Sequence, residues 1–162
     1  MSIDRAVTES GLTRVGAIEQ AILSHKGIAE ACVIGIPDPM KGHLPFAFIT
    51  PAGPGSAEEL PATAPEKLFK EVNAEVRSQI GAIATLGGML QGRGMIPKTR
   101  SGKTLRRVLR ELVEHATEGN FDKEVNVPPT VEDRAVVEVA RQRVKLYFDE
   151  RSSKGQELKA KL

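Results

Sequence analysis

A short, nearly continuous apolar run from residue 28 to residue 36 sets the strongest constraint on the fold of this 162-residue chain. Gly27 and Pro37 bound the run, which predicts a buried β-strand. A second apolar segment, residues 46–50, ends at Pro51 and predicts a second strand. A small sheet of this kind needs helices packed against it to cover its apolar surface.

Helical periodicity accounts for much of the remaining apolar sequence. Apolar residues recur at helical spacing from 17 to 22, from 69 to 80 and from 105 to 116. Gly27 and Gly81 are placed to end the first two of these helices. We therefore expect three helices around the sheet.

Weaker signals lie between and after these elements. Residues 51–65 hold four prolines and two glycines and predict an exposed loop, while Pro37–Pro39 predicts a turn. The glycine-rich residues 84–96 predict a short strand with turns. Thr130–Asp133 resembles a capping box, which predicts a last helix that ends near Glu150 before a fraying polar end.

The order of elements predicts an α+β fold: a small two-layer domain with a short β-sheet packed with helices, plus a C-terminal helical extension. We expect an N-terminal tail or severed linker at residues 1–14, a compact unit at 15–116, a linker at 117–129, and a C-terminal helix with a polar tail at 130–162. Seven apolar residues should be buried in the compact unit: Val33, Ile34, Val72, Val76, Val108, Leu109 and Leu112.

Composition argues against several classes of protein. The single cysteine, Cys32, rules out an internal disulfide and a cysteine-based zinc cluster, and its apolar surroundings predict a buried thiol. His25 and His43 are isolated in the sequence, so we expect no metal site. No apolar stretch approaches the roughly 20 residues that cross a bilayer, and the N-terminus has no apolar signal core. We therefore expect no membrane partner and an intracellular protein of the cytosol or the mitochondrial matrix.

The net charge of +2 is unevenly distributed along the chain. Between Val76 and Arg110 there are eight Lys or Arg residues and no Asp or Glu, so the rest of the chain is net negative. This asymmetry predicts an anionic partner such as phosphate, a nucleotide or nucleic acid; a solvated basic face is the alternative. The stretch has no aromatic residue to stack on bases, which disfavours nucleic acid.

The most informative segment is PKTRSGKT, from Pro97 to Thr104, directly before the helix at 105–116. Its cations and hydroxyls can meet phosphate oxygens, Gly102 permits a backbone conformation that is unfavourable for other residues, and a helix N-terminus favours an anion. The alternative is an exposed basic loop that caps a helix and binds no ligand. The segment also ends like a phosphate-binding loop, but Pro97 replaces the first glycine and no apolar run ending in Asp follows. A P-loop nucleoside triphosphatase is therefore disfavoured.

The run Pro-Lys-Thr-Arg-Ser-Gly-Lys, followed by Leu-Arg-Arg, resembles the C-terminal lysine motif of AMP-forming acyl-CoA synthetases, and within them the acetyl- and propionyl-CoA synthetase branch. The segments GAIEQAILSHKGIAEACVIGIPD and EVRSQIG are similar to the elements that precede the motif in that family. FDKEVNVPPTVEDRAVVEVA is similar to the trailing helix of the branch. The resemblance covers roughly residues 15–150.

The resemblance implies roles for individual residues. Lys103 takes the position of the motif lysine, which acts by charge stabilisation when the acyl-adenylate forms. Arg77 matches an arginine that meets a coenzyme A phosphate. Arg100, Ser101 and Gly102 are the other residues expected to bind cofactor, and Lys103 is a possible site of lysine acetylation.

The resemblance also implies substrates and a partner. In the family, a carboxylic acid attacks the α-phosphate of ATP to give an acyl-adenylate and pyrophosphate, and coenzyme A then takes the acyl group while AMP leaves. ATP with Mg and coenzyme A are therefore expected substrates of a parent enzyme, with acetate or propionate as the acid, and none should bind tightly to this chain alone. The expected partner is the family's large N-terminal adenylation domain, over which the small domain swings between two poses.

The sequence departs from the family in two respects. It lacks the phosphate loop, adenine pocket and acid pocket of the large domain, so we expect an excised domain or a truncated gene product that is inactive alone. The family's Gly-His-Arg loop is also altered, because residues 10–16 read SGLTRVG. The residues by themselves leave a second function open: a stand-alone basic module that binds an anion, a nucleotide or nucleic acid.

Overall fold

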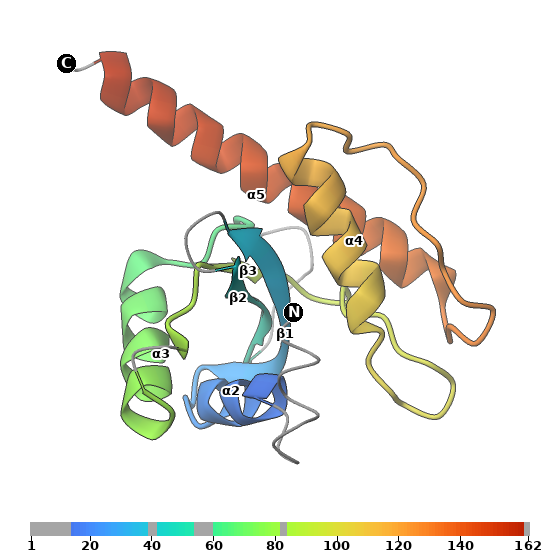
Figure 1. Ribbon diagram of the computed structural model, residues 1–162, viewed down its shortest axis with the longest axis horizontal. Helices are drawn as coiled ribbons and strands as arrows, with labels where there is room; N and C mark the ends of the chain where they lie inside the picture. Colours follow the sequence, from blue (N-terminus) through green and yellow to red (C-terminus); the bar gives the residue numbers. More distant parts are fainter. Residues whose placement is uncertain (1–13, 39–41, 54–59, 82–83, 161–162) are drawn as a thin grey trace.

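The computed structural model describes residues 14–38, 42–53, 60–81 and 84–160 (Figure 1). Residues 1–13 of the predicted N-terminal tail and part of the predicted loop at 51–65 therefore lie outside the described residues, whereas Arg14 begins a helix. The elements along the chain are α2 (Arg14–Leu23), β1 (Ile28–Asp38), β2 (Gly42–Pro51), α3 (Glu66–Gln79), β3 (Gly88–Gln91), α4 (Arg106–Thr117) and α5 (Arg134–Ala160).

The three strands form one mixed sheet in the order β1-β2-β3. β1 and β2 pair as an antiparallel hairpin, with Val33 opposite Ala47. β2 and β3 pair in parallel, with Phe48 opposite Leu90. A parallel pair needs a crossover connection, and α3 supplies it.

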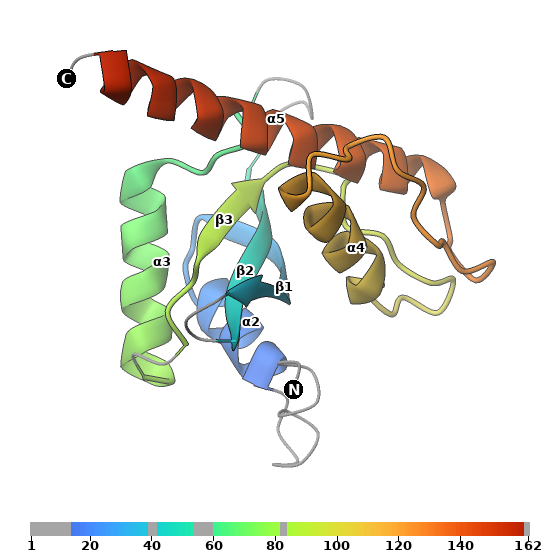
Figure 2. The same ribbon diagram turned by 45° about the horizontal axis from the view of Figure 1, so that its top comes forward.

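Helices cover both faces of this sheet (Figures 1 and 2). Val33 points into an apolar cluster with residues of α2 and α3, whereas its neighbour Ile34 points into a second cluster with residues of α4 and α5. Successive strand residues face opposite sides, so a strand covered on both faces must be apolar at nearly every position. This explains the continuous apolar run of β1. The predicted α+β class is confirmed, and the helices of the second face form a third layer.

The seven predicted core residues are all buried, with at most 4% of any of them exposed. The hairpin differs from the expectation at its turn. Pro37 and Asp38 belong to β1, and β2 begins at Gly42, four residues before the predicted Phe46. β1 is an edge strand, where a proline need not donate to the ladder, so Pro37 does not end it.

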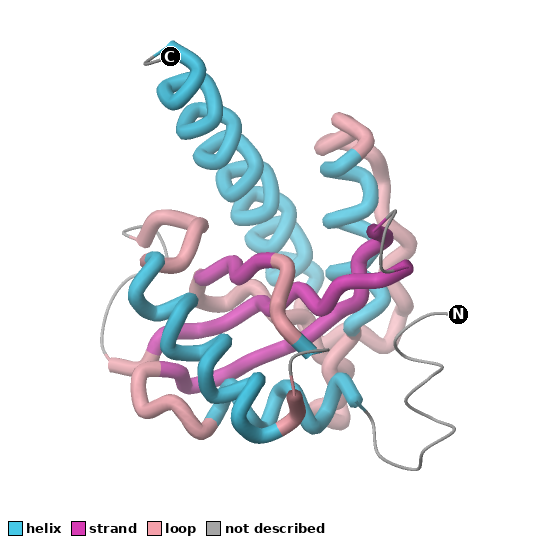
Figure 3. The backbone as a smooth tube through the Cα atoms, turned by 60° about the vertical axis from the view of Figure 1, so that its left-hand side comes forward, coloured by secondary structure: helices cyan, strands magenta, loops and turns pink. Residues whose placement is uncertain are grey.

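The last helix is longer and is capped differently than the capping-box pattern predicted. The N–H of Ala135 donates to Asp133 Oδ1 at 2.9 Å, so Asp133 rather than Thr130 caps α5. The helix continues to Ala160 instead of ending near Glu150, because its final residues are mostly good helix formers and one glycine costs only about 1 kcal/mol. Its C-terminal turns project beyond the rest of the domain (Figure 3).

The end of the predicted exposed loop at 51–65 is in fact packed. Ala62 is fully buried, and its carbonyl accepts the N–H of Gln91 at 2.8 Å, alongside β3. From α5, the carboxylate of Glu150 accepts the N–H groups of Ala62 and Thr63 at 3.0 and 2.7 Å. Proline content alone predicted exposure, whereas these long-range hydrogen bonds hold the segment between the sheet and α5.

None of the helices described combines the length and apolarity needed to cross a bilayer.

Candidate functional site: the lysine loop

The lysine loop, Pro97–Leu105, connects β3 to α4 as a narrow closed loop. At its base, the N–H of Leu105 donates to the carbonyl of Pro97 at 2.9 Å. Nearer its tip, the N–H of Thr99 donates to the carbonyl of Lys103 at 2.8 Å. Backbone hydrogen bonds therefore fix the loop at two levels before any ligand is present.

The tip of the lysine loop is a tight turn whose backbone requires glycine. Gly102 has φ +89° and donates its N–H to the carbonyl of Thr99 at 2.9 Å. The Thr99 side chain reinforces the turn, because its hydroxyl accepts the N–H of Lys103 at 3.1 Å and lies 2.9 Å from Ser101 Oγ. The predicted conformational role of Gly102 is thus visible in the turn that precedes Lys103.

The two lysines of the loop have different surroundings. Lys98 Nζ lies 2.7 Å from Glu30 Oε1 on β1, so its charge already has a counterion. Lys103 is exposed, and its side chain makes no ion pair or hydrogen bond within the described part of the chain. Of the two lysines, Lys103 is therefore the one that is free to meet an external anion.

An open groove lies beside Lys103. One wall is the lysine loop and the other is the end of the segment that joins α4 to α5; the lining residues are Thr99, Arg100, Ser101, Lys103, Pro129 and Thr130. Exposed Arg100 adds a second positive charge. α4 begins directly after the loop without a side-chain cap at Leu105, so its positive dipole end is near the groove. These groups favour an anionic ligand.

The start of α4 is anchored by a carboxylate that sequence reasoning did not single out. Glu19, on α2, is only 9% exposed and accepts a hydrogen bond from Arg106 Nε at 3.0 Å. The same oxygen of Glu19 accepts the N–H of Val33 at 2.8 Å. The pair therefore links α2, β1 and the first residue of α4. Glu19 lies on an otherwise apolar helical face, and only that position in the pattern could have drawn attention to it.

Arg77 lies apart from the other predicted site residues. It is an exposed residue of α3. Figures 1 and 2 place α3 and the lysine loop on opposite sides of the molecule. The structure thus brings Arg100, Ser101, Gly102 and Lys103 together and leaves Arg77 on a separate surface.

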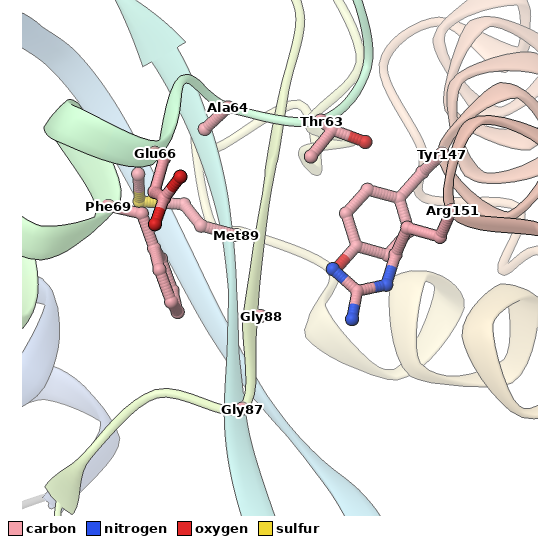
Figure 4. Close-up of a pocket in the computed structure, with 9 residues that line it drawn as sticks. All are labelled: Thr63, Ala64, Glu66, Phe69, Gly87, Gly88, Met89, Tyr147 and Arg151. Atoms are coloured by element: carbon pink, nitrogen blue, oxygen red, sulfur yellow. The ribbon is translucent and has the colours of Figure 1, made fainter. Parts of the chain in front are cut away.

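A second hollow lies at the edge of β3 and contains no predicted site residue (Figure 4). Glu66 of α3 lies on one side, Tyr147 and Arg151 of α5 lie on the other, and Gly88 of β3 lies between them. Arg151 lies 5.4 Å from the centroid of the Tyr147 ring and so contributes a cation–π contact. Its charge already has a partner, which distinguishes this hollow from the groove beside Lys103.

Comparison with known proteins identifies the class and then the family. The AMP-binding enzyme C-terminal domain model matches residues 17–103, which end at the candidate lysine. The chain is 38% identical over 140 residues to an acetyl-coenzyme A synthetase of Vibrio vulnificus strain YJ016, covering 85% of this chain and 20% of that protein. It is 39% identical over 138 residues to one of Aeromonas hydrophila, covering 84% of this chain and 20% of that protein.

Solved structures agree with this assignment. The acyl-CoA synthetase of Brucella canis superposes with a TM-score of 0.54 at 27% identity, over 67% of this chain and 18% of that one. The acetoacetyl-CoA synthetase of Streptomyces lividans has a TM-score of 0.57 at 20% identity, over 79% of this chain and 17% of that one, and supports the fold alone.

These findings define the molecule as a small C-terminal domain of the adenylate-forming class. More particularly, the chain belongs to the AMP-binding enzyme C-terminal domain family, and the relatives named above are acetyl-coenzyme A synthetases. The chain spans about a fifth of the length of the curated relatives it matches.

Proposed function

We propose that this chain is the mobile C-terminal domain of a short-chain acyl-CoA synthetase that acts on acetate or propionate, and that Lys103 supplies the charge for acyl-adenylate formation. The observation that carries the proposal is the exposed ammonium of Lys103, without a partner among the described residues, at the tip of a loop closed by backbone hydrogen bonds. Such a group is fixed at its base and free at its end.

The chemistry of adenylation explains why a lysine suits this position. When a carboxylate attacks the α-phosphate of ATP and pyrophosphate leaves, negative charge gathers around the reacting phosphorus. A compact ammonium on a flexible stem can reach that charge and stabilise it without transferring a proton. Arg100 and Ser101, which line the same groove, would support the phosphate.

Magnesium would accompany ATP in this proposal. No cluster of three or more His, Cys, Asp or Glu side chains able to hold a metal ion is found in the described ranges of the chain. In this proposal the ion is held by ATP and the large domain.

The second step would use a different surface of the same domain. The separation of Arg77 from the lysine loop suits a domain that rotates between two poses, one presenting Lys103 to ATP and the other presenting α3 to coenzyme A. In the second pose, the exposed guanidinium of Arg77 would bind a coenzyme A phosphate.

The chain alone would not activate an acid, because positioning of ATP and the acid belongs to the large domain. The test joins the full chain to the N-terminal part of the Vibrio vulnificus relative, in place of the 20% that it matches. The joined protein should catalyse ATP–pyrophosphate exchange with acetate or propionate, and the separate chain should not.

Two matched lysine variants of the joined protein then test Lys103. Lys103→Ala should reduce exchange by roughly 100- to 1000-fold, the usual effect of removing one preorganised charge. It should leave the conversion of preformed acyl-adenylate and coenzyme A to acyl-CoA near its normal rate. Lys98→Ala, on the same loop but paired with Glu30, should change neither step. Equal losses in the two variants would show a diffuse basic patch and contradict the assignment.

Acetylation of Lys103 should reproduce the effect of Lys103→Ala, because it removes the same charge. The exposure of Lys103 makes its amine accessible to an acetylating enzyme. Chemical or enzymatic acetylation of the joined protein, followed by the exchange assay, tests this; unchanged exchange in protein acetylated at Lys103 would exclude charge stabilisation by that amine.

The groove beside Lys103 also keeps a second function open, that of a stand-alone anion-binding module. In that case, the separate chain would bind ATP with an affinity that depends on Lys103 and Arg100, while the joined protein would show no exchange. Isothermal titration of the separate chain with ATP distinguishes the two functions.

A further inference from the structure

The lysine loop is held by a segment that lies far from it in the sequence. This anchor segment, residues 128–133, comes directly before α5. The N–H of Glu132 donates to the carbonyl of Lys98 at 2.8 Å, and the N–H of Arg100 donates to the carbonyl of Thr130 at 3.2 Å. Thr99 and Val131 form an antiparallel bridge between these two hydrogen bonds. The anchor segment therefore pairs with the loop as a short strand would.

The anchor segment is itself held in place at both ends. At its start, the N–H of Val131 donates to the carbonyl of Pro128 at 3.2 Å, which closes a turn. At its end, Asp133 caps α5. Val131 is only 6% exposed, so the centre of the segment is buried in the domain.

α5 connects the anchor segment to the rest of the fold. Its apolar face, including Val144 and Tyr147, packs into the cluster on the second face of the sheet. Its Arg143 and Glu150 bind backbone groups of the segment at residues 60–63. A chain of fixed contacts therefore runs from the sheet through α5 to the lysine loop.

The two sides of the loop are thus anchored by different parts of the protein. The side that carries Lys98 and Arg100 is paired with the anchor segment through backbone groups. The side that carries Lys103 leads into α4, whose first residue, Arg106, is held by Glu19. Only the tip is free, so the direction in which Lys103 extends depends on both anchors.

We infer that the anchor segment positions the lysine loop for adenylation, with Val131 and the backbone N–H of Glu132 as its positioning groups. The effect on adenylation rests on the proposed function of Lys103. The pairing of the anchor segment with the lysine loop does not depend on that function. The anchor segment lies beyond residues 17–103, which the family model matches, so it adds a support outside the matched domain.

Glu132 offers a variant pair that isolates one hydrogen bond. Glu132→Pro removes the N–H that binds Lys98, while Glu132→Ala removes only the side chain and keeps the N–H. In the separate chain, Glu132→Pro should accelerate hydrogen exchange at the amides of Arg100 and Thr99 by about tenfold or more relative to Glu132→Ala. This readout does not depend on activity.

In the joined protein, the same pair should separate the two half-reactions. Glu132→Pro should lower ATP–pyrophosphate exchange by about 10- to 100-fold relative to Glu132→Ala, because a displaced lysine no longer reaches the reacting phosphate. The rate of acyl-CoA formation from preformed acyl-adenylate should stay within about twofold, because the lysine interaction is made only in the adenylation step. A merely destabilised domain would lose both steps together.

A second pair keeps the test decisive if Glu132→Pro does not fold. Val131→Ala and Val137→Ala make the same change at two buried positions, 6% and 4% exposed, of which only Val131 pairs with the loop. Val131→Ala should accelerate amide exchange at Arg100 and lower pyrophosphate exchange, and Val137→Ala should do neither. The inference would be overturned if Val131→Ala and Val137→Ala showed the same amide exchange and the same pyrophosphate exchange, and if a folded Glu132→Pro showed unchanged amide exchange.

Absence of pyrophosphate exchange in the unmodified joined protein would instead reject the proposed function. The amide measurements would still decide the role of the anchor segment.

Discussion

Gly88 and Tyr147 pack so closely that no side chain fits between them. A Cβ built on Gly88 would lie 2.6 Å from Tyr147 Oη and 2.7 Å from Cε2 of Phe46. Phe46 and Tyr147 also meet edge to face, with ring centroids 5.4 Å apart. β3 and α5 can therefore approach each other only because residue 88 is glycine.

Gly88→Ala should lower the free energy of unfolding of the chain by about 1–3 kcal/mol, because the added methyl group overpacks the contact between β3 and α5. Gly87→Ala is the matched control: its Cβ would lie 3.1 Å from Cδ1 and 3.2 Å from Cβ of Leu44, which are less severe contacts than those of Gly88, so the loss should be smaller. Urea denaturation of both variants measures the difference. Equal stability of Gly88→Ala and the unmodified chain would show that α5 does not pack as described.

Tyr147 should make the chain less stable at alkaline pH. Burial raises the pKa of Tyr147 above its ordinary value, and the charge of Arg151 offsets part of the increase. Above about pH 10, the unfolded chain loses this proton while the folded chain retains it. The free energy of unfolding should therefore fall with rising pH, by up to about 1.4 kcal/mol per pH unit, until the folded-state pKa is reached.

The Tyr147→Phe variant isolates this effect, because Tyr147 is the one tyrosine of the chain. The difference in unfolding free energy between the two proteins should be constant below pH 10 and should shrink or change sign above it. A direct titration of tyrosinate absorbance in the folded chain gives the pKa. A midpoint at or below the ordinary tyrosine value would contradict the burial of this hydroxyl.

Gly102→Ala should strain the turn that precedes Lys103. Gly102 has φ +89° and open space around it, so the cost is conformational, about 1 kcal/mol, and not steric. Gly119→Ala provides a matched control, since Gly119 has φ +82° and equally open surroundings but lies after α4. The two should lose similar stability, yet only Gly102→Ala should reduce pyrophosphate exchange in the joined protein. Similar exchange in both would mean that the shape of the turn does not matter to catalysis.

Arg143→Lys should destabilise the chain by about 2–3 kcal/mol. The guanidinium is buried and donates to the carbonyls of Gln91, Leu60 and Pro61 at 2.7 to 3.2 Å, a spread that one ammonium cannot reproduce. Burial lowers the pKa of Arg143, and the charge of Glu150 raises it in part. The exposed Lys145→Arg is the control and should be neutral. Thermal unfolding of both variants tests the difference, and a neutral Arg143→Lys would show that these carbonyls find other donors.

Apolar runs and helical periodicity in the sequence were enough to predict two strands and the helices that pack on them, whereas the third strand was predicted from glycine content. Val33 and Ile34 lie in an apolar run that only a strand with two covered faces requires, and Leu109 and Leu112 recur at the spacing of a buried helical face. The burial of Ala62 could not be predicted in this way. It depends on hydrogen bonds with Gln91 and Glu150, which are distant in the sequence, and local composition carries no information about such partners.

The lysine loop was recognisable from its motif, but the contacts that support the loop were not. The motif around Lys103 carried the resemblance, and Gly102 indicated the turn. Nothing in the local pattern indicated that Glu30 neutralises Lys98 or that Val131 pairs with Thr99, because both contacts join segments far apart in the chain. The contact with Glu30 distinguishes Lys98, which has a counterion, from Lys103, which is free for a ligand.

The position of Glu19 has a consequence for the solubility of the domain. β1 is an edge strand, and an edge strand with free N–H groups can template pairing with another molecule and so start aggregation. The carboxylate of Glu19 accepts a hydrogen bond from the N–H of Val33 at the middle of that edge. The same residue that holds Arg106 therefore also protects the domain against edge-to-edge association, and a change that removed this carboxylate would free that N–H for pairing with a strand of another molecule.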